Sequence, residues 1–133
     1  MKKIRLCIGT NDEKNIADSH MGDTEIFHIY DIFESAEKQF VAKRINNAKD
    51  MEHDKVDKMK KILEIVKDSD VLVAGRKSPN FVNIAKKTKY QPVIVKTKKI
   101  PAILDLISQK FSEIDLYVAK RQNGEIFEDI PVF

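Results

Sequence analysis

DVLVAGRKSP, residues 70–79, contains the strongest structural signal in the chain. Its apolar run from Val71 to Ala74 is continuous, as in strands that are buried on both faces of a parallel sheet. Ser78 and Pro79 follow shortly afterwards, and these residue types favour the N-cap and the first turn of a helix. A buried strand that leads into a helix is half of a β-α-β unit, so we expect an α/β fold.

Helix and strand patterns alternate on both sides of this segment. Upstream, apolar residues recur with the period of a helix over residues 54–66. Downstream, we expect a helix over residues 78–89, a short strand over 92–95 and a third helix over 101–111. The second half of the chain therefore predicts two consecutive β-α units.

The first 45 residues have the apolar alternation of strands instead. Strands are expected over residues 4–9, 25–33 and 39–45, and Lys43 and Arg44 mark the last as an edge strand. Their short connections favour an antiparallel meander. The complete order, β-β-β-α-β-α-β-α, predicts a mixed five-stranded sheet with helices on its faces.

The C-terminal region shows a turn signal. Asn123-Gly124 stands between two apolar segments, residues 116–118 and 126–127, which is the pattern of a type I′ hairpin. We therefore expect a C-terminal β-hairpin. The length of 133 residues predicts a single domain.

Composition excludes several classes of protein. The net charge of +3 arises from 24 basic and 21 acidic residues that are interspersed, so no nucleic-acid partner is expected. No apolar run is long enough for a bilayer, and the N-terminus lacks a signal-peptide cleavage site, so we expect no membrane association and a cytoplasmic location. The common nucleotide-binding and hydrolase motifs are absent, which predicts a protein that is not an enzyme.

The single cysteine limits metal chemistry. Cys7 alone makes neither a disulfide framework nor an all-cysteine cluster site within one chain. It lies in the middle of an expected strand, where an inert buried thiol is usual. Any metal site must therefore use histidine, carboxylates, backbone groups or a second chain.

The topology predicts where ligand-binding residues converge. The first, third and fourth strands end at one edge of the sheet, the carboxyl edge at which open α/β sheets bind ligands. His20 follows the first strand, His53 the third, and the turn from Gly75 to Pro79 the fourth. Because imidazole is a common metal ligand, His20 is the first candidate and His53 the second. The simpler alternatives are a surface histidine at 20 and a polar residue before an N-cap at 53.

Two neighbouring side chains have alternative interpretations. Met21 offers either a soft thioether ligand or a plug over the site. His28 lies on a strand face between apolar residues, so a structural role is expected for it.

Several segments are similar to those of a known family. IADSHMG at residues 16–22 resembles its loop motif vs-x-HFG-x-a, and FHIYD at residues 27–31 stands where the family has f-x-i-y-d. Residues 70–79 are similar to its vdvvi-x-G-x-iGp-x-a segment. The chain thus resembles the dinitrogenase iron–molybdenum cofactor biosynthesis family, the NifX/NifB C-terminal type of domain. The resemblance spans roughly residues 1–112 and leaves 113–133 as a C-terminal extension.

This resemblance implies a ribonuclease-H-like fold without the nuclease residues. It also implies binding or carriage of an iron–sulfur or iron–molybdenum cluster, with the family's loop histidine falling on His20. Met21 replaces a phenylalanine of the family, and Arg76 stands where the family has a glycine-rich turn. Either Arg76 contacts an anion, or its presence indicates that this chain binds a different ligand from the family's. Together with the topology, the resemblance leads us to expect a cofactor site at His20, Met21 and Gly22, next to an anion pocket lined by Gly75, Arg76 and Ser78. His20 is the expected metal ligand, and His53 is the second candidate.

Three functions from different classes follow. The first is a non-catalytic carrier, monomeric or weakly dimeric, that exchanges a cluster with donor and acceptor proteins. The alternative is a protein-interaction or regulatory module without a metal. A nucleic-acid-processing role is suggested by analogy of fold alone.

Overall fold

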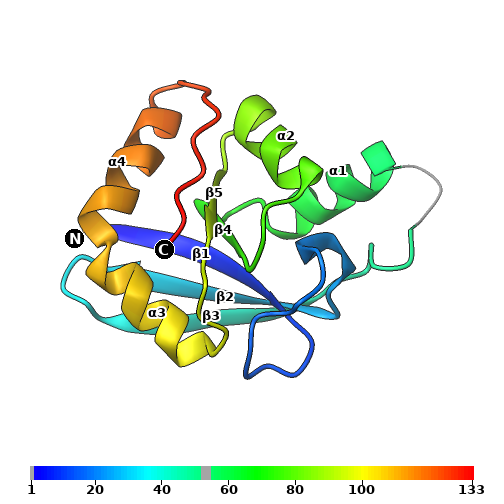
Figure 1. The fold of residues 1–133 in the computed structure, drawn as a ribbon, viewed down its shortest axis with the longest axis horizontal. Coiled ribbons are helices and arrows are strands. Elements are labelled where there is room, and N and C mark those ends of the chain that lie inside the picture. The colour runs from blue at the N-terminus through cyan, green and yellow to red at the C-terminus, as the bar shows by residue number, and fades with distance from the viewer. Residues whose placement is uncertain (1, 52–54) are drawn as a thin grey trace.

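The computed structural model describes residues 2–51 and 55–133, which fold around one mixed sheet (Figure 1). The sheet has five strands in the order β3-β2-β1-β4-β5. The pairs β1–β2 and β2–β3 are antiparallel, whereas β4 is parallel to both β1 and β5. The predicted α/β fold is confirmed, and it is consistent with a ribonuclease-H-like arrangement. The strands are β1 (Lys3–Thr10), β2 (Ile26–Phe33), β3 (Lys38–Ile45), β4 (Val71–Ala74) and β5 (Gln91–Ile94).

Helices cover both faces of this sheet. Those on one face are α1 (Lys55–Ile65) and α2 (Pro79–Lys87), and those on the other are α3 (Ile100–Gln109) and α4 (Phe111–Gln122). A short 3-10 helix, η1 (Met21–Asp23), lies between β1 and β2. None of the helices in the described ranges has the length and apolar character needed to cross a membrane.

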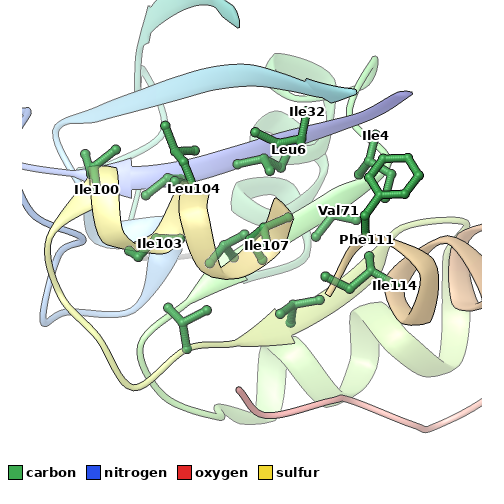
Figure 2. Packing of buried hydrophobic residues seen from close by; sticks show 14 of the residues in the cluster. Ile4, Leu6, Ile32, Val71, Ile100, Ile103, Leu104, Ile107, Phe111 and Ile114 are labelled. Carbon is green, nitrogen blue, oxygen red and sulfur yellow. The ribbon is translucent and has the colours of Figure 1, made fainter. Parts of the chain in front are cut away.

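The alternation of side chains along β1 divides the core into two clusters. Leu6 and Ile8 belong to the cluster under α3 and α4, whereas Cys7 faces the opposite side, beneath α1 and α2. Figure 2 shows the first cluster, in which Ile103 and Ile107 of α3 pack over the sheet. Because β4 and β5 are buried along their whole length, candidate ligand-binding residues are left to the loops that follow them, whereas β3 has no buried residue.

The predicted C-terminal hairpin is wrong, because residues 111–122 form helix α4. Ile114 and Val118 are one helical turn apart, and both are buried in the same core cluster as α3. This packing outweighs the local preference of the segment for strands. The helix begins at Phe111, so it crosses the boundary expected between the core segment, residues 1–112, and the C-terminal extension, residues 113–133.

The Asn-Gly signal ends α4 instead of starting a hairpin. Gly124 has a φ of +89°, the left-handed conformation in which glycine is favoured. Its N–H donates to the carbonyl of Arg121 at 3.0 Å, and the N–H of Glu125 donates to the carbonyl of Lys120 at 3.0 Å. This pair of hydrogen bonds is a Schellman motif, so the glycine has the role of a helix C′ residue.

The last residues of the chain lie along the outer edge of β5. Ile94 N–H donates to the carbonyl of Pro131 at 3.0 Å, and Phe133 N–H donates to the carbonyl of Ile94 at 2.9 Å. Lys96 N–H donates to the carbonyl of Phe133 at 2.9 Å. Figure 1 shows this segment in red beside β5. Its backbone covers an edge that would otherwise be open to another strand.

Candidate functional site

Loops from four strands meet at the carboxyl edge of the parallel strands. β3 and β4 both run in the direction of β1, so residues 11–20, 46–51 and 75–78 follow strands that end at this edge. The loop after β5 joins them. The predicted location of the site at this edge is therefore consistent with the topology. His53 lies outside the described residues, so its predicted position is not tested.

A cavity of about 490 Å³ opens at this edge between η1, α1 and α2. Its volume falls within the range of about 300–1,000 Å³ that is usual for ligand sites. His20 is exposed at the cavity, whereas Met21 is only 8% exposed. The predicted residues His20, Met21, Gly22 and Ser78 all line it, together with Asp23, Met51, Lys58, Met59, Ile62, Leu72, Pro79, Asn80, Phe81 and Ile84.

Side-chain hydrogen bonds from Asn46 and Thr24 hold the turn that follows His20. The Nδ2 of Asn46 donates to the carbonyls of Gly22 and Thr24, at 3.0 and 2.8 Å. The hydroxyl of Thr24 donates to the carbonyl of Met21 at 3.0 Å. A Cβ on Gly22 would lie 2.9 Å from Cδ1 of Ile62, so a larger residue here would require the end of that side chain to shift.

The loop before this turn is also fixed by hydrogen bonds. The carboxylate of Asp12 accepts the N–H groups of Lys14 and Asn15, at 2.9 and 2.8 Å. The side chain and the N–H of Asn15, with the N–H of Lys14, hold the pKa of Asp12 well below its usual value. Asp12 is thus an acceptor that shapes the loop, a usual role of aspartate in turns.

The polar groups around the cavity mouth differ in how far they are already paired. Lys58 Nζ contacts Asp23 Oδ1 at 2.6 Å and donates to the carbonyl of Lys49 at 3.1 Å. Among the described residues, the imidazole of His20 makes no hydrogen bond or ion pair. Asn80 is the other exposed polar side chain of this cavity without a side-chain partner among the described residues. Of the two, only the imidazole of His20 is a common metal ligand.

Three thioether side chains line the same cavity, from Met21 in η1, Met51 after β3 and Met59 in α1. Thioether sulfur is a soft donor that suits soft metals and sulfur-bridged clusters. The sequence placed Met59 on the inner face of a helix, where a core role is the usual expectation. Met51 follows a strand without any pattern around it, so no local signal identifies it as a cavity residue.

Gly75 and Arg76 line a second cavity rather than the first. This smaller cavity, of about 270 Å³, lies between the loops after β1, β4 and β5. Ser78 belongs to the first cavity, where its hydroxyl accepts the N–H of Phe81 at 3.2 Å as the N-cap of α2. The predicted set of site residues is therefore divided between two neighbouring cavities.

The remaining candidate ligands are inside the sheet layers. Cys7 is completely buried, and burial raises the pKa of its thiol. His28 is 6% exposed, and its two ring nitrogens contact Tyr30 Oη at 3.0 Å and Glu13 Oε1 at 3.1 Å, which agrees with a structural role. No group of three histidine, cysteine or acidic side chains arranged to hold a metal occurs within residues 2–51 and 55–133.

Comparison with known proteins identifies one related family. The family model described as dinitrogenase iron-molybdenum cofactor matches residues 2–110. No curated protein matches the chain at a significant level. The matched segment contains all five strands and the helices from α1 to α3, so it includes the walls of both cavities.

Proposed function

This chain belongs to the dinitrogenase iron-molybdenum cofactor family, and from that membership we propose that it is a carrier that binds an iron–sulfur or iron–molybdenum type cluster, or a precursor. The cluster is cargo in the larger cavity, and the protein does not catalyse a reaction on it. His20 is the ligand from the protein, and Met21 and Gly22 form the adjoining wall.

One observation supports this proposal above the others. An exposed imidazole with no partner among the described residues stands at the mouth of a 490 Å³ cavity whose wall contains three thioethers. Neutral imidazole binds metals well, and a wall of thioether and apolar groups suits the sulfide surface of a cluster. A histidine with only a surface role needs neither the cavity nor the soft donors.

The same donor set explains how cargo would be released. Sites that hold clusters permanently use several cysteine thiolates. The only cysteine, Cys7, is buried within β1, so the cluster would be held by imidazole and weak thioether contacts without a thiolate. Donor and acceptor proteins then reach the cargo at the open mouth of the cavity. His53 remains the predicted second ligand.

Anaerobic titration of the protein with a preformed iron–sulfur or iron–molybdenum cluster, followed by absorbance, tests the proposal. We expect stoichiometric binding by the wild type and loss of binding in His20→Ala. Arg76→Ala is the matched control, because it changes only the second cavity and should bind as the wild type does. His53→Ala in the same titration tests the second ligand.

Two results would contradict the carrier proposal. The wild type would bind no cluster, or His20→Ala would bind as tightly as the wild type while circular dichroism shows that both are folded. The protein-interaction or regulatory module without a metal then becomes the better explanation. A concentration-dependent change in molecular mass, measured by sedimentation, would support that alternative.

A further inference from the structure

The smaller cavity has no part in the proposed cluster site, yet its chemistry is distinctive. Its wall contains three cations, Arg76, Lys96 and Lys98, and a single acid, Asp18. Arg76 and Lys96 are exposed, and neither forms an ion pair or side-chain hydrogen bond within the described part of the chain. Lys98 contacts Asp18 at 3.4 Å, with both side chains largely in solvent. The hollow therefore has a surplus of positive charge.

The walls that carry these cations are fixed by backbone hydrogen bonds. Ile16 N–H donates to the carbonyl of Lys98 at 2.8 Å, which joins the loop after β1 to the loop after β5. Val95 N–H donates to the carbonyl of Ala74 at 3.0 Å. The N–H of Lys96 is bound by the C-terminal residue, Phe133. An anion would thus enter a preformed hollow, without ordering of the backbone.

We propose that this cavity binds a tetrahedral oxyanion of phosphate type. Arg76 presents the planar donor fork that matches such oxygens, and Lys96 and Lys98 add point charges around it. The volume of about 270 Å³ is sufficient for such an ion or for the terminal group of a larger ligand. The position, outside the carboxyl ends of parallel strands, is where open α/β sheets bind ligands.

Such an oxyanion has two chemical sources, a free inorganic ion or the terminal group of a phosphate monoester. Isothermal titration calorimetry with inorganic phosphate, molybdate and glycerol phosphate in a chloride buffer separates them. Binding of all three indicates a site that is open to esterified ligands. Binding of the inorganic ions alone indicates a site that admits only the free oxyanion.

Arg76→Ala is the first variant, and Lys77→Ala is its matched control, because Lys77 is an exposed neighbour that does not line the cavity. We expect Arg76→Ala to weaken phosphate binding between about tenfold and about hundredfold, as loss of a charge-assisted hydrogen bond does. Lys77→Ala should change the affinity much less. Asp18→Asn removes the acid of the cavity and should tighten binding by about fivefold.

The gain expected for Asp18→Asn keeps the test decisive, since a folding defect cannot strengthen binding. The proposal is overturned if the wild type binds no oxyanion at millimolar concentration. Equal losses in Arg76→Ala and Lys77→Ala would also overturn it, because they would show general attraction to a basic surface. The oxyanion site does not depend on the cluster proposal, since His20 does not line this cavity. His20→Ala should therefore leave phosphate binding unchanged.

Discussion

Replacing Arg121 by alanine should strongly destabilise the fold, although the residue lies outside the matched family segment. Its guanidinium is buried and donates to Gln91 Oε1 at 2.7 Å, to the carbonyls of Ala85 and Thr88 at 2.9 and 3.0 Å, and to that of Phe127 at 3.1 Å. These contacts join α4 to β5, to the C-terminal end of α2 and to the last segment of the chain.

The expected loss follows from these four contacts. Each hydrogen bond from a charged donor contributes about 1.5–3 kcal/mol, but removing the guanidinium also relieves the cost of its burial. The amide oxygen of Gln91, in a fully buried side chain, would lose its partner, which costs about 1–3 kcal/mol. We therefore expect Arg121→Ala to lower the unfolding free energy by about 3–5 kcal/mol, a large part of the usual 5–15 kcal/mol.

Urea denaturation followed by circular dichroism measures this change. With a slope of about 1.5 kcal/mol per molar urea, the midpoint should fall by about 2–3 M. Gln122→Ala is the control, because this neighbour is exposed and its replacement should change stability by less than about 0.5 kcal/mol. A loss below about 1 kcal/mol for Arg121→Ala would refute the reasoning and show that apolar packing alone holds α4.

Two further predictions concern the strands. Hydrogen bonds from Arg5, together with one from Lys3, lower the pKa of the buried Asp31 below its unfolded value of about 4. The ionised Asp31 therefore contributes its full share of the folding stability above about pH 4, and this share is lost as the pH falls through the pKa of the folded state. The urea midpoint of the wild type should fall on acidification. The midpoint of Asp31→Asn should fall less, because this variant has no carboxylate at position 31 to protonate. Gly9→Ala should lower the thermal midpoint through a cost of about 1–3 kcal/mol, because its Cβ would lie 2.8 Å from the Thr24 methyl group.

Most of the sheet was predictable because the burial of a strand determines which of its residues are apolar. The apolar run of β4 and the alternation in β1 and β2 follow from which faces are covered. The C-terminal region was not predictable from its turn signal. Asn123-Gly124 suits both a hairpin and a helix end, and the choice depends on Ile114 and Val118, whose burial requires α3 to be in place.

The sequence predicted that the loops of the candidate site lie at one edge of the sheet, but not that they form two separate cavities. Chain order places the loops of His20 and Gly75 at the same end, which is a property of topology. The separation of Gly75 and Arg76 from Ser78 depends on the path of one short turn. The helical spacing of Met59 indicates an inner face, but not that this face borders a cavity. Met51 follows β3 without any local pattern that marks it as a cavity residue.

The position of Cys7 makes it a poor ligand for the proposed cluster. Cys7 lies at the centre of the sheet, paired with Ile29 in β2 and with Leu72 in β4. Its burial raises the pKa of the thiol, and exposing the sulfur would require β1 to separate from a neighbouring strand or a helix to leave the sheet. His20 needs neither change, because its imidazole already faces solvent on a short turn. The proposed carrier role requires uptake and release of cargo while the core stays folded, and a ligand histidine on an exposed turn is compatible with that requirement.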